Sequence, residues 1–164
     1  MGDSTIHRFS EQAIRFLGFV DFVPGALTRL LVGFAFLDSG RGKLEGMENT
    51  VNFFTDLGIP FPELNAMFVA RLEYYGGMLL LAGLLTRITA ALLSTTMVVA
   101  LITADRENFT GALARSAEIG LSDIPAFALL VFLSWLVVRG AGALSLDHLA
   151  SRFLARGDKA EKTG

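Results

Sequence analysis

Apolar residues gather in four long segments of this chain, with shorter polar stretches between them. The segments cover residues 25–44, 65–85, 88–104 and 124–138. A membrane-spanning helix needs about 20 mostly apolar residues, and the four segments lie at or near that length. The pattern therefore predicts an all-α membrane protein, organised as a four-transmembrane-helix bundle.

The connections refine this prediction. Only Thr86 and Arg87 separate the second and third segments, which predicts a tight antiparallel hairpin. Residues 45–64 are too apolar for a free loop, so we expect them on the membrane surface. The sequence from Ser122 to Pro125 supplies a cap candidate and an early proline, which are typical of a helix start.

The N-terminal region has a different periodicity. Residues 4–22 place apolar side chains on one helical stripe and most polar side chains elsewhere. This predicts an amphipathic helix in the membrane interface, and an ordinary helix docked on its neighbours is the alternative. Charges interrupt the region too often for a cleavable signal peptide. We therefore expect an N-terminal amphipathic segment (1–24), a transmembrane domain (25–150) and a polar cytoplasmic tail (151–164).

Composition agrees with a lipid environment and excludes several chemistries. Of the 164 residues, 52% are hydrophobic and 18% are charged, whereas soluble domains average about 25% charged residues. With no cysteine, the chain cannot use disulfide, thiolate or iron–sulfur chemistry. His7 and His148 map outside the spans, so we expect no haem, and no spacing motif predicts a metal site. The net charge of −2 gives no indication of a nucleic-acid partner.

The distribution of basic residues predicts the orientation. Nine of the 14 Lys and Arg residues map to the side of the two termini, and five map to the other side. Because basic residues are enriched on the cytoplasmic side, we expect a multi-pass protein with both termini in the cytoplasm.

Charged and small residues share one face on each of the first two helices. At 100° per residue, Arg29, Gly33, Gly40 and Lys43 lie together on the first helix. The second helix carries a matching face, composed of Glu73, Gly76 and Gly77. Arg29 precedes Lys43, and Glu73 precedes Arg87, by the same 14 residues. Packed antiparallel, the two helices would place Lys43 beside Glu73, so we predict an ion pair that faces the bundle interior.

This pair suggests a polar pocket near the outer leaflet. We expect Lys43 and Glu73 to bind a ligand, with further candidates around the rim: Asp38, Arg41, Arg71, Tyr74 and Tyr75. The alternative is an ion pair that only sets the register of the two helices. Both interpretations remain open at this point.

Several motifs together resemble a known family. They are RLLVGFAFL (29–37) with Ser39-Gly40 and Lys43-Leu44, FFxxLGIPxP (53–62), ExxGGxLLLxGLxTR (73–87) and GxxSLD (142–147). In order and spacing these motifs are similar to those of DoxX-like membrane proteins. The family-pattern positions are Arg29, Gly40, Lys43, Glu73, Gly76, Gly77, Arg87 and Asp147.

The resemblance implies a four-helix bundle in a bacterial or archaeal plasma membrane. It also implies an association with thiosulfate:quinone oxidoreductase, with quinol oxidase complexes, or with complexes that handle oxidative or thiol stress. Our first hypothesis is an accessory subunit of a quinone-linked redox complex, which holds no cofactor of its own and offers a pocket for quinone. Electron transfer would then need a membrane or soluble partner that carries the cofactor, and the chain would not be catalytic alone.

Two other functions stay open. One is a structural or assembly scaffold for other membrane proteins, without ligand or activity. The other is a small-solute transporter, which four helices could form only as a homo-oligomer. A cavity beside the ion pair would favour ligand binding, and its absence would favour the scaffold.

Overall fold

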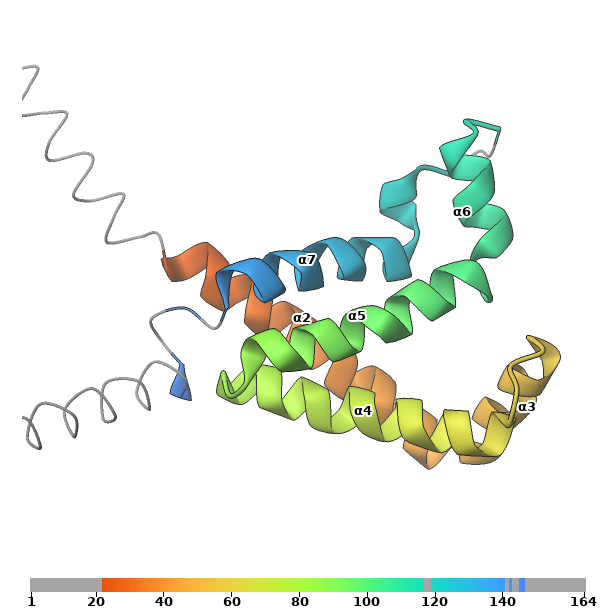
Figure 1. Cartoon of the computed structure of the whole chain (residues 1–164), viewed down its shortest axis with the longest axis horizontal. Coiled ribbons are helices and arrows are strands. Elements are labelled where there is room, and N and C mark those ends of the chain that lie inside the picture. Colours follow the sequence, from red (N-terminus) through yellow and green to blue (C-terminus); the bar gives the residue numbers. More distant parts are fainter. Residues whose placement is uncertain (1–21, 117–118, 141, 143–144, 147–164) are drawn as a thin grey trace, which may run out of the picture.

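The computed structural model of the chain describes residues 22–116, 119–140, 142 and 145–146. The predicted N-terminal amphipathic helix, the polar tail, both histidines and Asp147 lie outside these residues. Within them the fold is helical throughout, with no strand (Figure 1). The four long helices are α2 (Phe22–Glu45), α4 (Pro62–Ala82), α5 (Thr86–Ile102) and α7 (Pro125–Arg139).

Each long helix coincides with one of the four apolar segments. The segment predicted to lie on the membrane surface contains a short helix, α3 (Met47–Asp56), with a strongly one-sided distribution of apolar residues. The polar connection before α7 contains α6 (Arg106–Leu113) and a 3₁₀ turn (Leu121–Asp123). The all-α prediction is therefore confirmed for the described residues.

The long helices pack as two antiparallel pairs, α2 with α4 and α5 with α7, and α4 also contacts α5 (Figure 1). Their shared core consists of fully buried aliphatic and aromatic side chains. Its largest fully buried members are Phe36, Leu80, Leu93, Ile124, Leu133 and Leu136.

Close contact between α2 and α4 depends on glycine, as predicted. A Cβ atom on Gly40 would overlap the backbone nitrogen of Tyr74, and one on Gly77 would lie 2.5 Å from the backbone nitrogen of Leu37. Gly33 faces Leu81 in the same interface. Gly76 faces α5 instead, where a Cβ would lie 3.2 Å from Leu93. Small residues thus let the two backbones approach closely.

Two arginines stabilise the end of the bundle where α4 meets α5. The guanidinium of Arg87 donates a hydrogen bond to the carbonyl of Val138 at the end of α7, at 3.2 Å. Arg29 is 5% exposed and packs against Gly83, which closes α4 in the left-handed conformation (φ 68°). Arg29, Gly33, Gly40, Gly76, Gly77 and Arg87 therefore all occupy packing positions in the structure.

When length and hydropathy are considered together, no single described helix is sufficient to cross a membrane. The pair α5 and α6 would be sufficient, but the two helices meet at an angle of 83°.

Candidate ligand pocket

Three side chains meet near the middle of α4. The Lys43 ammonium forms an ion pair with the Oε2 atom of Glu73, as the sequence predicts. Ser39 lies one turn before Lys43 on α2, and its hydroxyl donates to the same oxygen at 2.8 Å. The ammonium also donates to the Ser39 hydroxyl at 2.7 Å. The result is a closed triangle of hydrogen bonds among Ser39, Lys43 and Glu73.

Burial differs between the two charges. Glu73 is 2% exposed, whereas the side chain of Lys43 is 27% exposed. Glu73 is the twelfth of the 21 residues of α4, so the carboxylate lies close to the midpoint of that helix. A buried charge is stable only when it is paired and hydrogen-bonded, and the triangle provides both.

A cavity of about 520 Å³ opens beside the triangle. Its walls come from α3, α4 and α5, with Lys43 reaching in from α2. Apolar side chains make up most of the lining, including Phe53, Phe54, Phe68, Val69, Met97 and Val99. The cavity has the size of a small-molecule site, which typically measures about 300–1,000 Å³.

Most polar groups in this cavity already have partners. The hydroxyls of Thr95, Thr96 and Thr103 donate to carbonyls of their own helix. The amide of Asn65 donates to the Pro60 carbonyl at 2.6 Å. Lys43 and Glu73 differ, because the ammonium has three donors and uses two of them within the triangle. Among the described residues, the Oε1 atom of Glu73 receives no hydrogen bond.

The five predicted rim residues are not where we expected them. Asp38, Arg41, Arg71, Tyr74 and Tyr75 are not among the described residues that line this cavity. On α4, Arg71 and Tyr75 each lie about 160–200° around the helix from Glu73 at 100° per residue, and they face outward. Arg41 pairs with Glu45 of its own helix at 2.8 Å. Tyr74 lies against Gly40 in the α2–α4 contact and packs its ring on Tyr75 at 5.4 Å.

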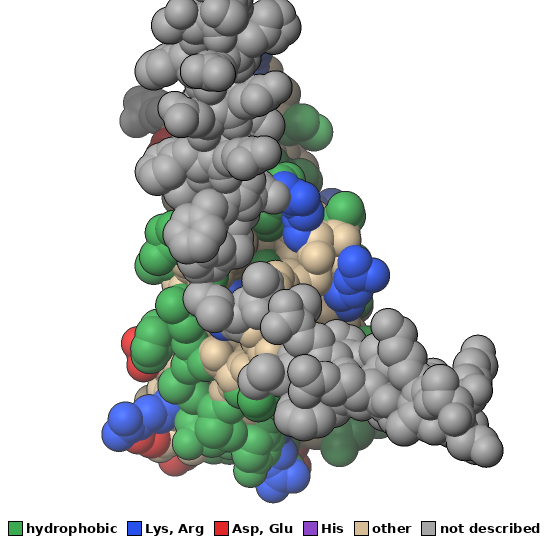
Figure 2. All heavy atoms as spheres, turned by 90° about the vertical axis from the view of Figure 1, so that its left-hand side faces the viewer, with side chains coloured by type: hydrophobic (Ala, Val, Ile, Leu, Met, Phe, Trp, Pro, Cys, Tyr) green, Lys and Arg blue, Asp and Glu red, His purple; other side chains and the backbone are tan. Residues whose placement is uncertain are grey.

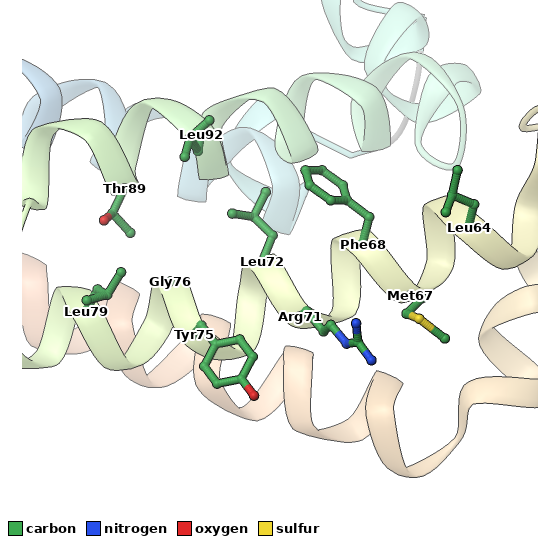
Figure 3. Close-up of a pocket in the computed structure, with 10 residues that line it drawn as sticks. All are labelled: Leu64, Met67, Phe68, Arg71, Leu72, Tyr75, Gly76, Leu79, Thr89 and Leu92. Carbon is green, nitrogen blue, oxygen red and sulfur yellow. The ribbon is translucent and has the colours of Figure 1, made fainter.

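Arg71 and Tyr75 line a second hollow, which lies over α4 and α5 (Figure 3). Its volume is about 430 Å³, and its other walls are mainly apolar side chains of α4 and α5. In Figure 3 both residues extend to the side of α4 away from α5. This hollow contains no member of the Ser39–Lys43–Glu73 triangle.

Two parts of the site were not predicted from the sequence. Ser39 was part of a motif but was not a candidate ligand, although its position one turn before Lys43 gave a signal at i, i+4. The walls contributed by α3 and α5 gave no signal, because apolar residues at helical spacing are the rule in any core.

These observations define an all-helical domain with a paired buried charge beside a partly open, mainly apolar cavity. The DoxX family model matches residues 25–106, which contain α2 to α5 and the whole triangle. The chain therefore belongs to the DoxX family, a family of membrane proteins. This confirms the resemblance found in the motifs.

One curated relative extends this comparison. The Bacillus subtilis (strain 168) protein named "Putative oxidoreductase CatD" is 39% identical to this chain over 77 residues. The match covers 47% of this chain and 56% of the relative, so it spans little more than half the length of that protein. No solved structure matches the chain.

Proposed function

We propose that this chain is a four-helix membrane subunit of a redox complex, and that the cavity beside Lys43 and Glu73 binds a quinone. The observation that carries the proposal is the cavity itself: about 520 Å³, mainly apolar, with one buried ion pair in its wall. An ion pair that only set the helix register would not need such a space beside it.

Exposed apolar side chains support a place in the membrane. The outer faces of the long helices carry large hydrophobic residues, among them Leu31 (70% exposed), Phe34 (56%) and Val138 (74%). The end-on view in Figure 2 shows hydrophobic side chains over much of the described surface, with Lys and Arg side chains at its edges. A protein in water rarely exposes contiguous apolar surface of this kind. We propose the plasma membrane as its location, with both termini in the cytoplasm.

The hydrogen-bonding capacity of the triangle suits a quinone. The unused N–H of Lys43 can donate to a carbonyl oxygen, and the Oε1 atom of Glu73 can accept from the hydroxyl of the reduced form. The aromatic and aliphatic walls then enclose the ring. This arrangement binds and orients the ligand.

In this proposal the electrons come from another protein. The chain has no cysteine and therefore no thiolate ligand for an iron–sulfur cluster. The name of the Bacillus subtilis relative contains the word oxidoreductase. That name agrees with a role for this chain in a complex with a redox protein. We therefore propose that a partner carries the redox cofactor and that this chain presents the quinone to it.

Quinone titration of the full-length protein in lipid nanodiscs tests the proposal. A short-chain benzoquinone should bind saturably, and Lys43→Met or Thr96→Phe should weaken binding at least about ten-fold, by removing a donor or by filling the cavity. Arg71→Met, in the separate second hollow, is the matched control and should leave binding unchanged. Equal affinity in all four proteins would overturn the quinone site.

The scaffold function keeps one observation in its favour. The triangle satisfies the two charges internally, so the pair needs no ligand to be stable. Purifying the tagged protein in mild detergent separates the two functions. Co-elution of a redox protein together with quinone supports the redox subunit, whereas co-elution of membrane proteins without quinone supports the scaffold.

A further inference from the structure

The side of α2 and α4 that faces away from α5 and α7 carries several charged side chains between apolar ones. We name this surface the α2–α4 outer face, and it consists of Phe34, Asp38, Arg41, Glu45, Arg71 and Tyr75. All six side chains are exposed. The glycine contacts show which side of each helix faces the other helix. At 100° per residue, the six residues then lie on the exposed sides of α2 and α4.

The charges on this face are incompletely paired. Arg41 and Glu45 form an ion pair along α2. Asp38 and Arg71 make no hydrogen bond or ion pair with any residue that the structure describes. The α2 half therefore has an excess of one negative charge, and the α4 half has an excess of one positive charge. In a membrane such charges are costly unless another group meets them.

The register of α2 against α4 sets the levels of these charges. Gly40 lies against Tyr74, and Leu37 lies against Gly77. By the same register Asp38 is level with the turn that holds Tyr75. Arg71 is level with the last turns of α2, between Asp38 and Glu45.

We infer that a second copy of this chain docks on the α2–α4 outer face through a two-fold axis parallel to the helices. Such a rotation keeps every residue at its own level and places α2 of one copy against α4 of the other. Arg71 of each copy then comes level with the Arg41–Glu45 pair of the second copy, about one and a half helical turns from its Asp38. Tyr75 comes level with Asp38 of the second copy and can donate its hydroxyl proton to that carboxylate.

A second copy fits this face better than an unrelated partner because the face is complementary to itself. Its negative half and its positive half exchange places under the rotation, so each half faces the half of opposite charge. The exposed ring of Phe34 adds apolar area to the same surface. The inference rests on the membrane placement given under the proposed function, and it leaves the quinone cavity on the other side of α4 untouched.

Because the native chain has no cysteine, disulfide cross-linking gives a direct test. Asp38→Cys with one epitope tag and Tyr75→Cys with a second tag are expressed together, and the membranes are oxidised. A disulfide requires Cα atoms less than about 7 Å apart, so a dimer that carries both tags is expected. The control pair replaces Tyr75→Cys with Val131→Cys, exposed on α7, and should give no such dimer.

Charge reversal provides a second readout. Counting subunits by photobleaching in lipid vesicles should show Arg71→Glu weakening dimerisation about ten-fold or more, and Asp38→Lys combined with Arg71→Glu should restore it. Equal cross-linking in both cysteine pairs, or a monomer under all conditions, would overturn the dimer. Quinone binding by the same samples shows whether the proposed function survives, and fractionation shows whether the membrane placement does.

Discussion

Lys43 and Glu73 stabilise each other, and neither charge has a comparable substitute partner among the described side chains. Ser39 joins them by accepting from the ammonium and donating to the carboxylate. Removing one of the three side chains therefore leaves the remaining groups without their hydrogen-bond or charge partner in a buried environment. The energetic consequence should depend strongly on which members remain.

A double-mutant cycle tests this dependence. Lys43→Met alone should destabilise the protein by about 3 kcal/mol, because it leaves the buried Glu73 carboxylate unmatched. Glu73→Gln alone should cost less, because the Lys43 ammonium is partly exposed to solvent. The double variant should lose clearly less than the two single losses together. Thermal unfolding in detergent measures all three. Losses that simply add would show that the two side chains act independently.

Ser39→Ala gives a smaller and separate effect. The substitution leaves the ion pair but removes one donor to Glu73 and one acceptor for Lys43, so a loss of about 1–2 kcal/mol is expected. Ser94→Ala is the control, because its hydroxyl donates only within its own helix. A Ser39→Ala protein as stable as wild type would exclude the hydroxyl from the triangle.

At the scale of single residues, the sequence predicted the Lys43–Glu73 ion pair but not the residues that line the cavity beside it. Equal spacing of charges and glycines on two helices was enough to bring Lys43 to Glu73. Asp38 and Arg71 were grouped with them only because they are polar and close in sequence. Helical periodicity already turns both away from the face of Lys43 and Glu73, and the packing of α2 on α4 shows that neither lines the cavity.

At the scale of helices, glycine decides how closely α2 approaches α4. The overlap that a Cβ would create at Gly40 involves backbone atoms of Tyr74 and Ala70. Backbone cannot move aside as a flexible side chain can, so the two helices would have to separate.

Gly40→Ala should therefore destabilise the protein by about 1–3 kcal/mol through overpacking. Gly42→Ala is the matched control two residues away on the same helix, where a Cβ meets nothing within 4 Å. That variant should equal wild type or exceed it, because alanine favours a helix over glycine by up to about 1 kcal/mol. Equal melting temperatures for the two variants would contradict the close contact.

Arg87 connects the start of α5 to the end of α7. Its hydrogen bond to the Val138 carbonyl satisfies a group that the helix itself leaves unpaired, and its charge suits a helix C-terminus. Arg87→Met should cost about 1–2 kcal/mol and speed amide exchange in the last turn of α7, whereas Arg87→Lys should lose less. Unchanged exchange in Arg87→Met would show that the contact is dispensable.

Helix positions were predictable because long apolar segments and turn residues mark them clearly. The short helix α3 was expected only as a surface segment, although it supplies a wall of the cavity through Phe53 and Phe54. Its role depends on how residues 57–61 fold α3 back onto α4, and a single sequence does not reveal that packing.

For the whole molecule, family membership and exposed apolar surface support insertion into the lipid bilayer. The orientation rests on the excess of basic residues on the side of the termini.

A reporter fusion tests the orientation. Green fluorescent protein joined to the C-terminus should fluoresce and should remain with the membranes after alkaline extraction. Alkaline phosphatase at the same position should be inactive, because it folds only outside the cytoplasm. The opposite pair of results would reverse the topology, and fluorescence released into the supernatant would contradict membrane insertion.

The short link between α4 and α5 also limits how the cavity can change shape. Only Gly83, Leu84 and Leu85 join the two helices. The distance between α4 and α5 is therefore fixed at this end of the cavity. The two helices can part most at their far ends, where Phe53 and Phe54 of α3 line the cavity. If a guest molecule enters at that end, its residence time should respond to substitutions in α3 more than to substitutions near the turn.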